Sequence, residues 1–190
     1  YLPKFVKIID GKFIYESKSG GYTDVLSDAK RYFAGNANPD VELGWSNTLT
    51  YKNNWSLDFS FRSLIGNKVY NATRSFFDSP GVSPSLNGLN DIYDWYEQGR
   101  TQGATIADIY LEDASFLRLD YLTLTYMVNT SKIDWLSSLK LFVVGNNLFT
   151  ITGYSGIDPE TTISGIDYGV DQYNVYPKTR SFSIGFNASF

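Results

Sequence analysis

Trp55-Ser56-Leu57-Asp58-Phe59-Ser60-Phe61-Arg62 is the stretch that decides the fold class of this chain. Its odd positions are all apolar and its even positions are all polar. Successive side chains of a β-strand point to opposite faces, so this alternation predicts a strand at 54–65 with one apolar and one polar face. The preceding segment, 40–51, alternates in the same way, and Lys52-Asn53 between the two predicts a hairpin turn.

Three more long strands are predicted downstream, at 116–127, 138–149 and 180–190. The first changes its apolar phase near Tyr121, which predicts a β-bulge or a bend. The last carries an apolar residue at every second position and ends on Phe190. A soluble sheet seldom ends on a bulky exposed aromatic residue, whereas bacterial outer-membrane barrels commonly do. Phe190 therefore resembles the signal that is recognised during barrel assembly.

The lengths of the strands and of their connections favour a membrane barrel. A tilted transmembrane strand needs roughly 9–11 residues, whereas strands of soluble proteins usually run to about 5–6. Short connections at 52–53 and 128–137 alternate with long ones at 66–113 and 150–178. In outer-membrane barrels the short turns are periplasmic and the long loops extracellular. We therefore expect the C-terminus in the periplasm.

A shorter pair of strands is predicted at 5–9 and 12–17, because Asp10-Gly11 between them is a strong hairpin signal. Residues 17–38 then form another external loop. The fold class is all-β, with five firm antiparallel membrane strands and up to seven if this pair also spans. An open sheet in lipid leaves edge N–H and C=O groups unsatisfied. Residues 1–190 are therefore expected to be the C-terminal segment of a large transmembrane β-barrel whose earlier strands lie outside this chain.

Composition excludes several classes of function. The net charge is −4 and Lys and Arg form no run, which argues against nucleic-acid binding. The chain has no Cys and no His, and therefore no thiolate metal site, imidazole base or Ser–His pair. We expect no enzymatic activity, no cofactor and no metal. The aromatic content of 17% fits the girdles of a barrel, but it also fits a soluble or surface-exposed β-domain for adhesion, which is the rival hypothesis.

Five blocks of sequence carry a resemblance to a known family. They are GNANPD at 35–40, LEDASFLRL at 111–119, GNNLFTIT at 145–152, YSGIDPE at 154–160, and YP at 176–177 with RSFSIG at 180–185. In this order the blocks resemble those of SusC/RagA-type TonB-dependent transporters. The departures are Asn146, where the family usually has Gln, and an unfamiliar stretch at 1–30.

The resemblance implies a plugged barrel of roughly 22 strands in the bacterial outer membrane, of which this chain holds the last. It also implies import of an oligomeric nutrient, a glycan or a peptide. The partners would be a SusD-like surface lipoprotein and TonB, which supplies energy through the N-terminal part of the transporter. The plug and the other barrel strands would complete the protein, and outer-membrane lipid would surround it.

The strand faces supply the first group of candidate site residues. Trp55, Leu57, Phe59 and Phe61 are expected to face lipid. The charged residues of the opposite faces either contact the plug and the transport path or are simply solvated in a water-filled lumen. These lumen-facing or plug-facing candidates are Asp58, Arg62, Arg118 and Asp120.

The long connections supply the second group. Asp158 and Glu160 flank Pro159, and they either bind a cation or form a turn in which Asp158 accepts backbone N–H bonds. Aromatic residues of the loops either stack on a substrate or fold their own loop. The substrate-binding candidates are Trp95, Tyr96, Tyr154 and Tyr168.

Overall fold

The computed structural model describes residues 1–79, 97–103, 105–160, 169–172 and 176–190. They form two compact units, and each unit takes segments from three regions of the chain. The strand unit comprises Asp40–Ile65, Ser115–Gly153 and Pro177–Phe190, and the loop unit comprises Tyr1–Pro39, Gly66–Ala114 and Tyr154–Tyr176. The long connections between strands therefore belong to a folded unit of their own.

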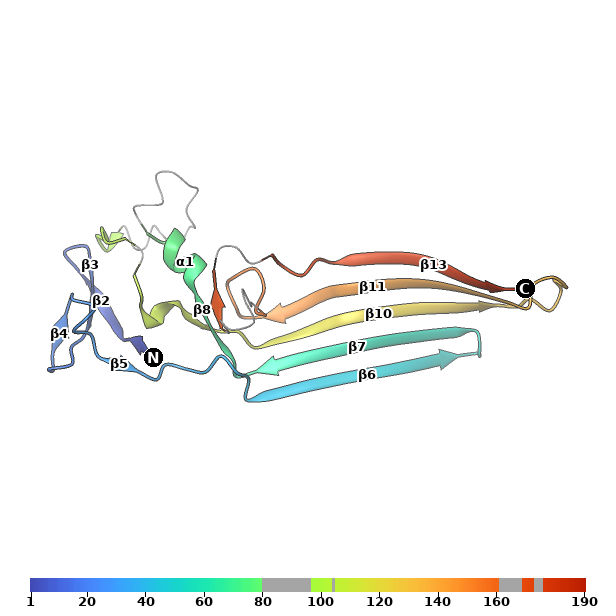
Figure 1. Ribbon diagram of the computed structural model, residues 1–190, viewed down its shortest axis with the longest axis horizontal. Helices are drawn as coiled ribbons and strands as arrows, with labels where there is room; N and C mark the ends of the chain where they lie inside the picture. The colour runs from blue at the N-terminus through green and yellow to red at the C-terminus, as the bar shows by residue number, and fades with distance from the viewer. Residues whose placement is uncertain (80–96, 104, 161–168, 173–175) are drawn as a thin grey trace. The chain divides into compact units, whose positions relative to one another are not determined.

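The strand unit is one antiparallel sheet of five strands in the order β13-β11-β10-β7-β6 (Figure 1). Its strands are β6 (Val41–Tyr51), β7 (Trp55–Ile65), β10 (Phe116–Val128), β11 (Ser138–Thr152) and β13 (Ser181–Ser189). These are the five long strands that the alternating pattern predicts, and the prediction is confirmed. Within the described residues, β6 and β13 each have a strand on one side only.

Two local features of this sheet follow from its sequence. Lys52 and Asn53 have φ of 49° and 56°, the left-handed conformation that a tight hairpin turn requires. The register of β10 shifts between Leu119 and Tyr121 against both of its neighbours. Because a bulge exchanges the two faces of a strand, this shift explains the change of apolar phase near Tyr121. The predicted hairpin and the predicted bulge are both confirmed.

In the residues that the structure describes, the loop unit contains only short elements. Its sheets are β1 (Leu2–Pro3) with β5 (Arg31–Tyr32); β2 (Phe5–Ile9), β3 (Lys12–Glu16) and β4 (Tyr22–Thr23); and β12 (Val170–Asp171), β8 (Lys68–Asn71) and β9 (Leu111–Asp113). It also contains α1 (Ala72–Phe77) and the 3₁₀ turn η1 (Asp108–Tyr110). The predicted pair of short strands forms β2 and β3, with Asp10 and Gly11 at φ of 50° and 76° in the turn. That pair lies outside the five-stranded sheet, so in the described residues the long sheet has five strands rather than seven.

A hydrophobic core lies inside the loop unit. Phe13, Tyr15 and Tyr110 are completely buried there. The Arg100 guanidinium enters this core, lies 4.5 Å from the centroid of the Phe13 ring and donates from Nη1 to the Tyr110 hydroxyl at 2.9 Å. Segments that the alternating pattern leaves as loops therefore have a core typical of a water-soluble protein. Among the described residues, no helix is long and apolar enough to cross a membrane.

Candidate functional site

The sheet of the strand unit has an apolar face that is ordered in rows. Across the strands, the register aligns Leu49, Leu57, Leu124, Val143 and Ile184 in an aliphatic row. On the side of this row toward the Lys52-Asn53 turn lies a row of Tyr51, Trp55, Tyr126, Leu141 and Phe186. Toward the opposite ends of the strands lies a row of Trp45, Phe61, Leu119 and Phe149. Aromatic residues thus lie on both sides of an aliphatic centre.

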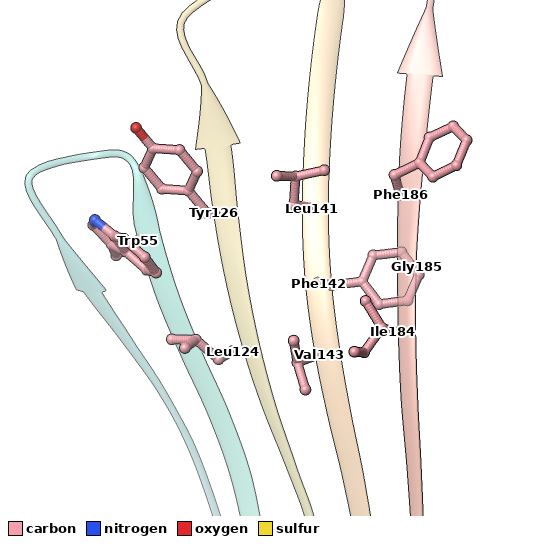
Figure 2. A pocket seen from close by; sticks show the side chains of 9 residues that line it. All are labelled: Trp55, Leu124, Tyr126, Leu141, Phe142, Val143, Ile184, Gly185 and Phe186. Carbon is pink, nitrogen blue, oxygen red and sulfur yellow. The ribbon is translucent and has the colours of Figure 1, made fainter.

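The aromatic rings of the apolar face contact one another. Trp45 stacks on Phe61 with ring centroids 5.8 Å apart, and Phe61 lies 6.1 Å from Phe149. Nearer the turn, the Trp55 and Tyr126 rings are 4.5 Å apart (Figure 2). Ile184, midway along the edge strand β13, is 85% exposed. A contiguous apolar surface of this kind marks a contact with membrane or with protein.

The opposite, polar face is held by hydrogen bonds between side chains. The Asp58 carboxylate accepts from the Thr48 hydroxyl at 2.6 Å and from the Ser56 hydroxyl at 3.2 Å. Two residues further along each strand, the Ser46 hydroxyl donates to the Ser60 hydroxyl at 2.8 Å. These contacts link β6 to β7 on the face away from the aromatic rows.

The other three charged candidates also lie on the polar face. Arg62 and Asp120 form an ion pair, with Nε 3.0 Å from Oδ2, and about a quarter of each side chain is exposed. Arg118 is only 2% exposed and donates from Nε to the Thr150 hydroxyl at 2.9 Å. Its guanidinium lies 5.2 Å from the centroid of the Phe116 ring. All four predicted charged residues therefore have hydrogen-bond or ion-pair partners within the sheet.

The predicted loop residues lie in two settings. Asp158 is 5% exposed and its Oδ1 accepts from the Glu160 N–H at 3.0 Å, which is the geometry of a turn. Within the described residues, no group of three or more acidic side chains could hold a metal ion. Tyr154 is buried and its hydroxyl donates to Asp171 Oδ2 at 2.6 Å. Burial and this hydrogen bond raise the pKa of Tyr154.

Of the four aromatic residues predicted to stack on a substrate, the structure describes Tyr154, and its ring is not exposed. The Tyr154 ring packs with Val69 and Ala114 inside the loop unit, so its faces are not open to a ligand. The other three candidates, Trp95, Tyr96 and Tyr168, lie outside the described residues.

Phe190 lies at the end of the sheet where the short connections are. Its ring stacks on Trp135, with centroids 5.8 Å apart and planes 14° apart. Both side chains are more than two-thirds exposed. The pair places two aromatic rings beside the turn-side row of the apolar face.

Comparison with known proteins shows which proteins the chain resembles. No family model matches the sequence. TonB-dependent receptor P3 of Formosa agariphila is 28% identical over 179 residues, which is 87% of this chain. TonB-dependent receptor SusC of Bacteroides thetaiotaomicron is 29% identical over 195 residues, which is 97% of this chain. The chain spans only 18% of the length of each of these relatives.

The fold agrees with this similarity. All of this chain matches 22% of a chain in the structure of the RagAB peptide transporter, with a TM-score of 0.81 and 25% identity. The chain is similar in sequence and in fold to SusC/RagA-type TonB-dependent receptors. The predicted resemblance is confirmed, and the relatives are receptors and importers rather than enzymes.

Several residues of this receptor segment escaped prediction from the sequence. They are Asn71, Glu112 and Asp171 of the loop unit and Trp135, which stacks on Phe190. Glu112 lies in one family-like block and Tyr154 in another, so the resemblance marks the region. No local pattern shows which of these side chains meet.

Proposed function

We propose that this chain forms part of the wall of an outer-membrane transporter that imports an oligomeric nutrient by a TonB-dependent mechanism. TonB-dependent receptors are proteins of the outer membrane. The observation that carries the proposal is the five-stranded sheet with an uncovered apolar face and a hydrogen-bonded polar face. Lipid would cover the apolar face, and the polar face would line the lumen or contact a plug.

The spacing of the aromatic rows supports a position across the membrane. Trp55 and Phe61 belong to the two aromatic rows and lie six positions apart on β7. At a rise of about 3.4 Å per residue, this separation is about 20 Å. The apolar band of an outer-membrane barrel is about 25 Å tall and has an aromatic girdle at each edge. At a strand tilt of about 35–45°, the separation corresponds to about 15 Å of membrane thickness, so both rows would fit within the apolar band.

The same sheet suggests an orientation. The β6–β7 turn and the C-terminus lie at one end of it (Figure 1). Short turns are periplasmic in barrels of this kind. We therefore place Phe190 at the periplasmic rim as part of the barrel-assembly signal, and the long connections on the extracellular side.

The edges of the sheet require further strands. The outward edges of β6 and β13 have no neighbouring strand in the described part of the chain. In hydrocarbon, each unsatisfied backbone group would cost several kcal/mol. We place this chain at the C-terminal end of the receptor, with a plug and the remaining strands supplied by the rest of the protein. β13 would close the barrel against its first strand.

The substrate class and the partners follow by analogy with the relatives. The RagAB structures are of a peptide importer, and SusC is a TonB-dependent receptor. We propose that the cargo is a glycan or a peptide oligomer. A SusD-like lipoprotein would act on the extracellular side, and TonB would act through the N-terminal part of the receptor.

Growth and uptake experiments test this proposal. Deletion of the receptor gene in the source bacterium should abolish growth on one class of oligomer, glycan or peptide, and leave growth on its monomers intact. An affinity-tagged receptor should co-purify with a lipoprotein in detergent. Loss of TonB should stop uptake but not binding at the cell surface. Unchanged growth together with release of the protein without detergent would instead support a surface β-domain for adhesion.

A further inference from the structure

A cluster of polar side chains joins segments of the loop unit that are far apart in the sequence. Asn71 ends β8, Glu112 lies in β9, and Ser155 lies in the connection that follows β11. Asn71 is 41 residues from Glu112 and 84 residues from Ser155. The cluster therefore links one long connection to the other.

Asn71 is the centre of the cluster. Its side-chain Nδ2 donates to Glu112 Oε1 and to Ser155 Oγ, both at 3.2 Å. Its Oδ1 accepts from the Arg74 backbone N–H at 2.8 Å and caps α1. The residue is only 2% exposed. The side-chain amide of Asn71 thus donates two hydrogen bonds and accepts one. Even a substitution that keeps its shape would change these hydrogen bonds.

The Glu112 carboxylate accepts hydrogen bonds from residues of both long connections. Its Oε1 accepts from Ser155 Oγ at 2.7 Å and from Arg74 Nη1 at 3.3 Å. Its Oε2 accepts from the Ser155 backbone N–H at 2.9 Å. Hydrogen bonds to a carboxylate are shorter and stronger than those between neutral groups. Glu112 therefore holds Ser155 by both its side chain and its backbone.

The turn that follows Ser155 is held at two further points. Asp171 accepts from the Tyr154 hydroxyl at 2.6 Å and from the Thr73 hydroxyl at 3.2 Å. Asp158 accepts from the Glu160 N–H, which closes the turn at its far end. Between them, Ile157 is 74% exposed. The apolar side chain of Ile157 is thus exposed to solvent, and hydrogen bonds hold the chain on both sides of this residue.

We propose that Asn71 and Glu112 form a polar clasp that locks the two long connections into one body and fixes the turn at 154–160. The two residues are positioning residues, because they act on the turn through Ser155. Through these hydrogen bonds the clasp keeps the turn in one conformation. The inference goes beyond the proposed transport function and does not depend on the identity of the cargo.

A spin label on the turn tests the clasp in the intact receptor in detergent. The 190 residues contain no Cys, so Ile157→Cys introduces a unique labelling site within them. The label should be strongly immobilised when the clasp is intact. Asn71→Asp keeps the shape of the side chain but sets a second carboxylate against Glu112, which should shorten the rotational correlation time of the label several-fold.

An exchange of groups distinguishes the clasp from a general loss of stability. In the double variant that combines Asn71→Asp with Glu112→Gln, the amide introduced at position 112 donates to the carboxylate introduced at position 71. The bond between the two positions is thereby restored with its direction reversed, and the double variant should regain most of the immobilisation that Asn71→Asp loses. A double variant as mobile as the single one would overturn the proposal, as would an immobile label in Asn71→Asp.

A matched label controls for the rest of the loop unit. Tyr22 in β4 is 66% exposed and belongs to a different sheet of that unit. A label on Tyr22→Cys should keep the same mobility in every variant, and all variants should show the heat-modifiable migration of an assembled barrel. Mobility that rises equally at positions 22 and 157 would show that Asn71 stabilises the whole unit, and this result would also overturn the proposal.

Discussion

The strand unit and the loop unit place the same kinds of side chain in opposite environments. In the strand unit, Ile184 and Phe186 project from the sheet and are 85% and 69% exposed. In the loop unit, Phe13 and Tyr110 are completely buried beside the Arg100 guanidinium. A sheet that leaves its apolar face open is suited to lipid, whereas a unit that encloses its aromatic residues is suited to water. The contrast indicates that the two units are packed for different surroundings.

The largest effect on stability is expected in the core of the loop unit. Phe13→Ala should cost about 3–5 kcal/mol, because it leaves a cavity at a fully buried aromatic residue. Amide exchange should rise throughout β2, β3 and η1 and stay unchanged in β7 and β10. Phe33→Ala, at a residue that is 62% exposed in the same unit, is the control and should change little. Equal loss of protection in the five-stranded sheet would show that the two units unfold together.

A charge on the apolar face should have a somewhat smaller effect on the strand unit. Phe59 lies next to the aliphatic row and contacts Trp45 at a centroid distance of 5.2 Å. Phe59→Arg should cost about 2–4 kcal/mol near the bilayer midplane. Ser60→Arg, on the polar face, should cost little. The measurement is equilibrium unfolding of the receptor in lipid vesicles, and equal costs at the two positions would reverse the assignment of the faces.

Packing across the last two strands of the sheet tests the polar face. Gly185 is paired with Phe142, whose ring lies over β13 (Figure 2). A Cβ on Gly185 would lie 2.5 Å from Phe142 Cζ, so Gly185→Ala should overpack the site and cost about 1–3 kcal/mol. Phe142→Ala in the same molecule should remove the clash, so the double variant should be more stable than the sum of the single changes predicts. Simple additivity in the thermal unfolding of the barrel would contradict this contact.

Alkaline pH should loosen the loop unit. Burial raises the pKa of Tyr110 to about 12, whereas an unfolded tyrosine has a pKa of about 10. The neutral form is thus favoured by folding, so its contribution is complete below about pH 10 and is lost as the pH rises through about 12. The measurement is tyrosinate absorbance as a function of pH. The difference between the wild type and Tyr110→Phe gives the titration of Tyr110. A midpoint near pH 10 would show that Tyr110 is not buried in solution.

The smallest effect on the stability of the inserted protein is expected at the C-terminus. The Phe190 ring contacts Trp135 at the edge of the apolar face. Deletion of Phe190 should sharply reduce the amount of heat-modifiable barrel in the membrane, while barrels that do assemble unfold almost as the wild type does. The corresponding change at the other short turn, Tyr51→Ala, is the control and should leave assembly intact. Normal assembly without Phe190 would remove its role as a signal.

The alternating pattern of the sequence predicted the five long strands, the hairpin at Lys52-Asn53 and the bulge near Tyr121. This was possible because a period of two is a local property, carried by each strand of nine or more residues. The pattern also placed Asp58 and Arg62 on one face of β7. It did not show that Arg62 pairs with Asp120, because that contact depends on the register between strands.

The loop unit shows what the sequence alone left open. Its described strands are two to five residues long, too short for a period to be recognised, and β12 pairs with β8 across about 100 positions of the chain. The sequence determined a two-faced sheet and, through its family-like blocks, the kind of receptor that the chain resembles. Only the tertiary structure brought Asn71, Glu112 and Ser155 together. Hydrogen bonds between distant segments depend on how the chain folds back on itself. The local spacing of residues does not predict that fold.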